Sequence, residues 1–150
     1  MRPGRRPLPA RALSLKRFAE AQAGVHERAL AELRAGRKTS HWMWFVFPQL
    51  RGLGQSPTAQ HYGIDGIGEA MAYLDHPVLG PRLLECAETV AATHGASAVD
   101  IFGTIDAMKL RSSMTLFARA VADNGPFVAV LGRFFDGVED ERTLALLAAS

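Results

Sequence analysis

The sequence predicts an all-α domain of about seven or eight helices of unequal length, packed in an irregular orthogonal arrangement. Apolar residues recur every three or four positions along most of the 150 residues, which is the spacing of one helix face. Strand-like alternation is nearly absent: only WFVF at 44–47 alternates, and Pro48 ends that run. A simple four-helix bundle would need four long, similar apolar stripes, and this chain has about three. We therefore expect crevices where short helices meet loops.

The first predicted helix runs from Leu15 to Leu33, because the apolar residues between them step by three or four. Ser14 is placed to cap its start, and Gly36 is placed to end it. A short second helix is predicted between Ser40, a capping residue, and Pro48, which restricts the residue before it.

The remaining apolar stripes predict a series of helices at 57–62, 67–74, 79–91, 97–102, 106–121, 126–134 and 140–147. Ser56 is a predicted N-cap, followed by a proline in the first helical turn. Gly103 closes the helix at 97–102. Pro126 suits a first turn, and Asp140 is placed to cap the last helix.

Composition indicates one soluble domain with a basic tail. Hydrophobic residues make up 48% of the chain and charged residues 21%, which is ordinary for a globular protein that needs no disulfide or metal. We expect a disordered basic tail at 1–13 and a single helical domain at 14–150. Residues 1–17 hold six basic groups and no acid, so the remainder has 11 basic and 15 acidic residues, a net charge of −4. Such a distribution lacks the ordered cationic face of a nucleic-acid-binding protein.

Several classes of protein are disfavoured by the sequence. The longest uncharged apolar run, 41–50, is far shorter than the roughly 20 residues that span a bilayer, and the first ten residues lack the apolar segment expected of a secretory signal. The single cysteine, Cys86, excludes an internal disulfide framework and suits a reducing compartment. We therefore expect a cytoplasmic protein without membrane contact. The five histidines are scattered, so neither a metal site nor a cofactor is predicted.

The segment 42–47 holds both tryptophans and two of the eight phenylalanines. One interpretation is an aromatic anchor in the core, which suits Trp42. Two tryptophans two positions apart cannot point the same way, so Trp44 is predicted nearer the surface. Beside His41 and Lys38 it would form a platform for a ligand, by stacking or by a cation–π contact.

The glycine-rich run RGLGQSPT at 51–58 follows directly. Gly52 and Gly54 permit close backbone approach, and Ser56 begins a helix whose first amides attract anions. His61 adds positive charge nearby. The alternatives are a phosphate or carboxylate site and a turn that only changes the direction of the chain.

The helix at 106–121 carries a polar face as well as an apolar one. Asp106, Lys109 and Ser113 follow at i, i+3 and i+7, with Ser112 adjacent. Small hydroxyl residues are unfavourable inside helices, so two in a row suggest either close packing or a polar face lining a crevice. An Asp106–Lys109 ion pair on the surface is equally compatible.

We expect these three runs to meet at one crevice, with His41, Trp44, His61 and Lys109 around it. The candidate ligand-binding residues are Lys38, His41, Trp44, Gly52, Gly54, Ser56, His61, Tyr62, Lys109, Ser112 and Ser113. The phosphate-binding and nucleophile motifs of common enzyme folds are absent from the sequence.

The motifs SHWMWFVFPQ, EAMAYLDHPVLGPRLLEC and IFGTIDAMKLRSSMTLFA resemble the bacterial domain-of-unknown-function family 1810. The resemblance extends from about Leu15 to Leu147. It implies a compact, mainly helical domain and brings no biochemical function with it. Members often carry the label calpastatin, but the calpain inhibitor is disordered, whereas this chain has helical stripes throughout.

The order of three motifs is also similar to that of the NADAR family, helical hydrolases of ADP-ribose and related N-glycosides. The similar parts are the aromatic segment, the run TAQHYGI, and the later DAMKLRSSMTLFARAV. This resemblance implies an N-glycosidic hydrolase, for which we take Asp106 or Glu69 as the candidate general acid–base and a bound water as the nucleophile. The sequence departs from that pattern at Gln60, where an acidic residue is expected before His61.

Three functions are therefore compatible with the sequence. The chain is predicted to bind an anionic, nucleotide-like small molecule in an aromatic and basic crevice. The alternatives are an N-glycosidic hydrolase of the same ligand class, and a protein-interaction module with an exposed aromatic patch. The oligomeric state is left open.

Overall fold

The computed structural model describes residues 10–149, with side chains from Leu15 onward. Within that range the protein is all-helical, as predicted: it has nine helices, seven of them longer than one or two turns. The described residues contain no strand, and the only β-type pairing among them is an isolated bridge between Leu50 and Ile64. None of the helices described is long and apolar enough to cross a membrane.

In chain order the helices are α1 (Ala10–Gln22), α2 (His26–Arg34), α3 (Met43–Val46), α4 (Pro57–His61), α5 (Ile67–Asp75), α6 (Leu79–Ala91), α7 (Ala98–Ala120), α8 (Gly125–Phe135) and α9 (Glu141–Ala149).

The first predicted helix is two helices in the structure. The chain turns between α1 and α2 at Gly24, whose φ of 75° lies in the left-handed region that favours glycine. The prediction of one continuous helix from Leu15 to Leu33 was therefore wrong, because the apolar spacing continues across the turn. Ser14 lies inside α1 and does not cap it, since α1 begins at Ala10. Residues 1–9 of the predicted tail lie outside the described residues.

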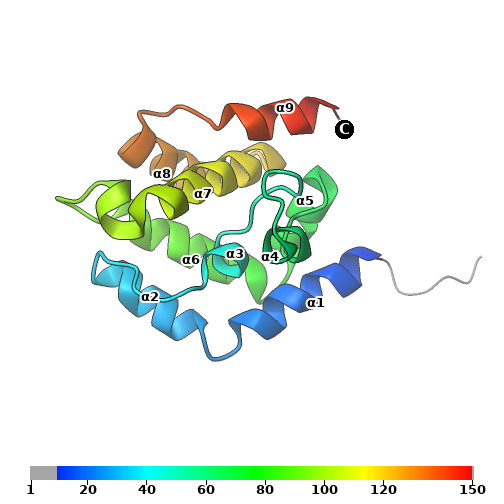
Figure 1. Ribbon diagram of the computed structural model, residues 1–150, viewed down its shortest axis with the longest axis horizontal. Coiled ribbons are helices and arrows are strands. Elements are labelled where there is room, and N and C mark those ends of the chain that lie inside the picture. Colours follow the sequence, from blue (N-terminus) through cyan, green and yellow to red (C-terminus); the bar gives the residue numbers. More distant parts are fainter. Residues whose placement is uncertain (1–9, 150) are drawn as a thin grey trace, which may run out of the picture.

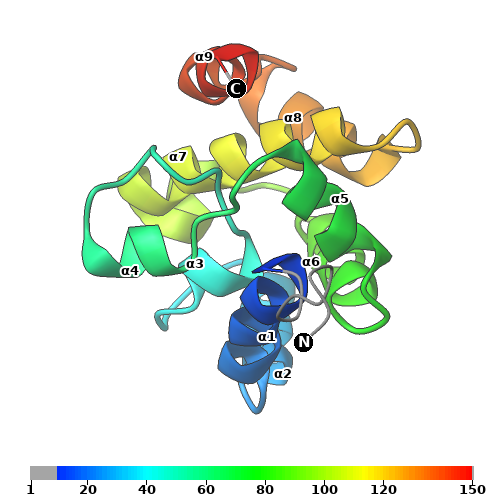
Figure 2. The same ribbon diagram turned by 90° about the vertical axis from the view of Figure 1, so that its right-hand side faces the viewer.

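The long helix α7 runs through the middle of the molecule and organises the packing (Figure 1). It packs against α5, α8 and α9, while α6 packs against α2, α5 and α8. Residues 112–118 of α7 are all buried, so this helix is covered on every side there. The helices cross in several directions and do not align as a bundle (Figure 2), which agrees with the predicted irregular packing.

α7 bends sharply near its start. Gly103 has φ 81° and ψ 165°, which is not helical, and it separates a short first helix from the rest. That short helix begins with a capping box, in which Ser97 and Asp100 exchange side-chain and backbone hydrogen bonds. The prediction of a short helix closed by Gly103 is thus confirmed.

Polar side chains from α1 hold the segments that carry the aromatic residues. Gln22 is buried, and its amide nitrogen donates to the Phe45 carbonyl at 2.7 Å and to the Tyr73 hydroxyl at 3.0 Å. Arg17 donates to the Gly63 carbonyl at 2.7 Å. Since buried polar groups are costly when unpaired, these bonds fix α3 and the end of α4 relative to α1.

Candidate functional site

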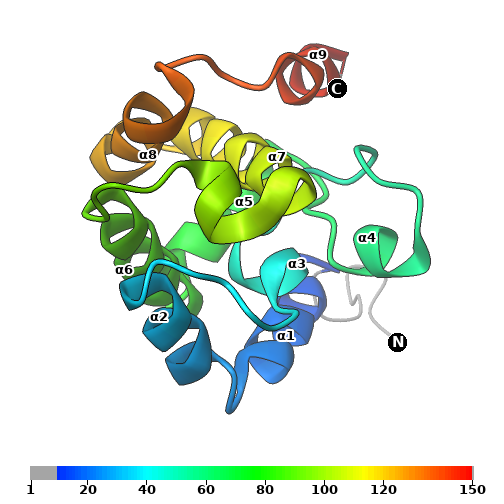
Figure 3. The same ribbon diagram turned by 60° about the vertical axis from the view of Figure 1, so that its left-hand side comes forward.

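A cavity of about 320 Å³ lies between α7, the segment from α3 to α4, and the start of α9. Figure 3 shows α9 beside the loop that joins α3 to α4. The lining residues are Trp44, Gln49, Leu53, Gly54, Gln55, Ser56, Ala59, Ile105, Met108, Lys109, Ser112, Asp140 and Arg142. Three segments that are distant in sequence therefore meet at one place.

Trp44 and Lys109 form the centre of this site. The Lys109 ammonium lies 4.0 Å from the centre of the Trp44 ring, well within the range of a cation–π contact. The Lys109 side chain is 18% exposed, so its charge is partly desolvated but still accessible from the cavity. The predicted contact between the aromatic segment and the polar face of α7 is present.

Asp106 sits between two lysines. Its carboxylate is 2.8 Å from the Lys38 ammonium and 3.3 Å from the Lys109 ammonium. Lys38 is nearly buried and its backbone N–H donates to the Ile101 carbonyl, so this segment is fixed against the first part of α7. Two cations share one anion, which leaves the cluster with a net charge of +1.

Glu32 on α2 holds the loop between α2 and α3, which carries Lys38. Its carboxylate accepts hydrogen bonds from the backbone N–H groups of Thr39 and Ser40, from the Ser40 hydroxyl and from the Trp42 indole. Partial burial alone would raise the pKa of Glu32, but the hydrogen bonds outweigh it and lower that pKa from 4.5 to about 2. The carboxylate thus remains ionised and anchors the loop.

The glycine loop, residues 51–56 of the glycine-rich run, packs closely on α4 at the cavity wall. A Cβ on Gly54 would lie 2.7 Å from the Ala59 Cβ, so only glycine allows this approach. Ser56 caps α4 as predicted, with its hydroxyl accepting from the Ala59 N–H at 3.1 Å. Gly52 does not line the cavity; it faces Leu146 of α9, which a Cβ would meet at 3.5 Å.

The start of α9 closes one side of the cavity. Arg142 donates to the Leu53 carbonyl at 3.1 Å, and the Asp140 carboxylate caps α9 by accepting from the Thr143 N–H and hydroxyl. The Asp140 N–H donates to Thr115 of α7 at 2.9 Å. The sequence identified Asp140 only as a helix cap and did not identify Arg142, because nothing in the sequence places these residues beside residues near position 53.

Two histidines that were predicted to lie at the site do not line the cavity. His41 is exposed and precedes α3, which begins only at Met43, so it lies outside the helical turn that presents Trp44. His61 is exposed at the end of α4 opposite Ser56, with its ring against Tyr62. α4 therefore turns Ser56 towards the cavity and the His61–Tyr62 pair away from it.

Tyr62 packs with the core instead. Its ring lies 5.4 Å from that of Phe45 and 6.0 Å from that of Phe18, contacts that fix α4 to α1 and α3. The single-crevice prediction therefore needs correction at His41, His61 and Tyr62, whereas Trp44 and Lys109 do meet.

The two serines of α7 have different environments. Ser112 lines the cavity, and its hydroxyl donates back to the Met108 carbonyl at 3.1 Å. Ser113 is fully buried, its hydroxyl has no hydrogen-bond partner among the described residues, and it does not line the cavity. Lys38 does not line the cavity either; it is linked to Lys109 through Asp106, which pairs with both lysines.

Glu69, one acid–base candidate, lies in a buried ion pair away from the cavity. Its side chain is 4% exposed, and its carboxylate pairs with Arg17 at 3.4 Å and accepts from the Asp65 N–H at 2.7 Å. These contacts join α1 to α5. Asp106, the other candidate, is engaged by two lysines and is not part of the cavity wall.

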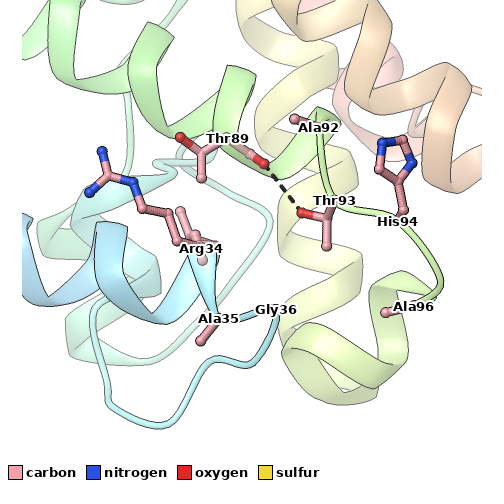
Figure 4. Close-up of a pocket in the computed structure, with 9 residues that line it drawn as sticks. Arg34, Ala35, Gly36, Thr89, Ala92, Thr93, His94 and Ala96 are labelled. Carbon is pink, nitrogen blue, oxygen red and sulfur yellow. Dashed lines mark hydrogen bonds between the residues drawn. The ribbon is translucent and has the colours of Figure 1, made fainter.

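A larger depression, of about 580 Å³, lies where α2 and α6 end. Figure 4 shows Arg34 and His94 on opposite sides of it, with Thr89 and Thr93 between them. Helix C-termini present carbonyl oxygens and a partial negative charge. Arg34 also pairs with Glu85 at 3.8 Å. This depression therefore suits an anion less well than the smaller cavity does.

The described part of the chain contains no cluster of metal-binding side chains, and its cysteine is not placed for thiol chemistry. His, Cys, Asp and Glu side chains there form no group of three able to hold a metal ion. Cys86 is buried on α6, and burial raises the pKa of its thiol to about 12. A thiol in that environment packs as an apolar group, as its place on an apolar stripe predicted.

The comparisons with known proteins agree with this fold. The chain belongs to the family described as Protein of unknown function (DUF1810), which it matches over residues 12–147. It is similar to the crystal structure of a conserved hypothetical protein from Mycobacterium tuberculosis, with 59% identity and a TM-score of 0.89, covering 91% of this chain and 97% of that one. No curated protein matches the sequence.

Proposed function

We propose that the cavity binds a small anionic molecule with a flat ring, such as a nucleotide. The observation that carries this proposal is the Lys109 ammonium held over the Trp44 ring in the cavity wall. Small-molecule sites are concave and mostly apolar, with a few convergent polar groups, and have volumes from about 300 Å³ upwards. This cavity has the volume and the convergent polar groups of such a site, and its apolar part is formed by Trp44, Leu53, Ile105 and Met108.

The balance of charge supports an anion. Lys109 shares Asp106 with Lys38, so its charge is only partly neutralised. Arg142 is a second cation in the wall, while the one acid in the wall, Asp140, serves as the cap of α9. An anionic group that enters the cavity therefore meets two cations and one carboxylate that is already hydrogen-bonded.

The apolar part of the wall supports a ring. Trp44 offers an aromatic surface, and the large apolar side chains of Ile105 and Met108 are 70% and 64% exposed at the same cavity. A ring between these groups would bury apolar area that is now in contact with water. Stacking on an aromatic side chain contributes about 1–3 kcal/mol per base in nucleic-acid complexes.

The test is a thermal shift with nucleoside mono- and diphosphates and ADP-ribose, because a ligand of the native state must raise the melting temperature. Lys109→Met should abolish the shift while changing the stability of the free protein little, since the methionine keeps an apolar stem over Trp44. Lys16→Met removes the same charge from an exposed pair on α1 and should leave the shift intact. Equal shifts in both variants would contradict the proposal.

A protein-interaction role is the second candidate, and one observation favours it: Ile105 and Met108 are large apolar residues exposed one turn apart. Replacing both by Ser distinguishes the two roles. If they contact a ligand, nucleotide binding weakens. If they contact a second copy of the chain, sedimentation shows a dimer that the double variant loses and nucleotide binding does not change.

No observation favours the hydrolase alternative over binding. Glu69 is committed to Arg17, and Asp106 is committed to Lys38 and Lys109, so neither carboxylate faces a ligand in the cavity. Incubation with ADP-ribose and chromatography of the products tests this alternative. We keep the cytoplasm as the proposed location, because the lone buried cysteine suits a reducing compartment.

A further inference from the structure

Two cations from different helices face the same cavity. Lys109 comes from α7 and Arg142 from the first turn of α9. They are 33 positions apart, counted from residue 109 to residue 142, and they enter the wall from separate elements. Such an arrangement can contact one anionic group from two directions.

The guanidinium of Arg142 is positioned but not neutralised. One of its terminal nitrogens donates to the Leu53 carbonyl at 3.1 Å, which fixes the side chain at the cavity. No carboxylate in the described part of the chain forms an ion pair with it. Since a guanidinium has five N–H donors in a planar fork, the remaining donors are available to a ligand.

The nearest acid in the wall is committed to a different task. Asp140 accepts both from the Thr143 N–H at 2.9 Å and from the Thr143 hydroxyl at 2.6 Å. These donors and the positive end of α9 offset its charge. The acid that contacts Lys109, Asp106, is likewise shared with the Lys38 ammonium at 2.8 Å. Both cations of the wall therefore retain charge for a ligand.

We infer that the ligand carries a phosphomonoester, and that Arg142 is its second contact and a specificity-determining residue. A phosphomonoester carries about two negative charges at neutral pH and three acceptor oxygens. Arg contacts such a group through two parallel N–H bonds, and Lys contacts it as a point charge. A phosphodiester or a carboxylate has one charge and would use only one of the two cations fully.

This inference rests on the proposed function and adds the chemical class of the anion to it. The ring would contact Trp44, and the phosphate would lie between Lys109 and Arg142. Because α9 delivers Arg142, the last helix becomes part of the binding site and not only a cover of the core.

The test uses isothermal titration at pH 7.5 with the full chain. The four common nucleosides are each titrated as the 5′-monophosphate, the 3′,5′-cyclic monophosphate and the free nucleoside. The unaltered protein should bind its best 5′-monophosphate at least about tenfold more tightly than the cyclic form, since the loss of one charge-assisted hydrogen bond weakens binding by about that factor or more.

Arg142→Gln should weaken binding of the 5′-monophosphate about tenfold or more and change binding of the cyclic form less than about twofold. Arg142→Lys should restore part of the loss. Arg28→Gln is the matched control, because Arg28 is an exposed arginine on α2, outside the cavity wall. Melting curves of each variant establish that it is folded.

The possible outcomes separate the two proposals. If R142Q binds the 5′-monophosphate as tightly as the unaltered protein, or if the cyclic form binds equally well, the inference is overturned and the nucleotide site stands. If the unaltered protein binds none of the twelve compounds, the inference fails; if the nucleoside diphosphates and ADP-ribose also give no thermal shift, the proposed function fails with it.

Discussion

Replacing Glu32 by Gln tests whether one carboxylate organises the loop behind the site. Glu32 accepts four hydrogen bonds, from Thr39, from Ser40 twice and from the indole of Trp42. Trp42 is fully buried, so its N–H has no water to replace the lost acceptor. Glutamine keeps the shape but has one acceptor oxygen, and it turns an N–H₂ group towards donors.

The magnitude follows from these contacts. A hydrogen bond to a charged group contributes about 1.5–3 kcal/mol, and bonds that share one acceptor group are not additive. We expect E32Q to lower the free energy of unfolding by about 2–4 kcal/mol at pH 7, measured by urea denaturation. Glu88→Gln on α6, an exposed glutamate, should change it by less than about 0.5 kcal/mol.

The effect should depend on pH in a defined direction. The folded-state pKa of Glu32 is about 2, below the usual 4.5, so its contribution is present above pH 4.5 and is lost as the pH falls towards 2. The difference between the unaltered protein and E32Q should therefore shrink between pH 6 and pH 3. A difference below about 0.5 kcal/mol at pH 7, within the range of surface substitutions, or one that does not change with pH, would refute this account of the loop.

Three further predictions concern stability and reactivity. Glu69→Ala should cost about 3–5 kcal/mol in urea denaturation, since it removes one partner of a buried ion pair that joins α1 to α5; a cost below 1 kcal/mol would show that the pair is not a structural link. Cys86 should not react with a thiol reagent at pH 8 until the protein is unfolded, because burial raises its pKa to about 12; rapid reaction in the native state would contradict this. Gly80→Ala should prevent stable folding, because a Cβ there would overlap the backbone of α5. Gly132→Ala, in open space on α8, should instead stabilise the protein by about 0.5–1 kcal/mol. Equal melting temperatures of these two variants would contradict the packing described.

Much of the fold could be predicted because helical periodicity is local information. The spacing of apolar residues predicted the all-helical fold correctly, and Gly103 and Ser56 could be recognised as a helix end and a cap. The break at Gly24 was missed, because the apolar residues on both sides keep the same spacing and a lone glycine is tolerated within helices.

The site could be predicted only where its parts lie close in sequence or on one helix face. Trp44 was expected near the surface because Trp42 occupies the core, and Lys109 was expected on the polar face of α7; the structure joins the two. The side on which α4 presents His61 depends on Arg17, whose side chain donates to backbone groups at the end of α4. That contact spans more than forty positions and leaves no local pattern.

The contribution of α9 could not be predicted for the same reason. Arg142 reaches the Leu53 carbonyl across 89 positions of sequence. The capping role of Asp140 was recognised from its place before the last helix, but a cap does not say which cavity the helix faces. Tertiary packing decides that, because the cavity faced by α9 is formed by α7 and the glycine loop.

A crystal structure of the protein with its best-binding nucleoside 5′-monophosphate tests the central claim most directly. The account predicts the ring against Trp44 and the phosphate within hydrogen-bond distance of the Lys109 ammonium, inside the cavity between α7, the glycine loop and α9. A nucleotide bound instead in the depression beside Arg34 and His94, or one that contacts neither Trp44 nor Lys109, would contradict it.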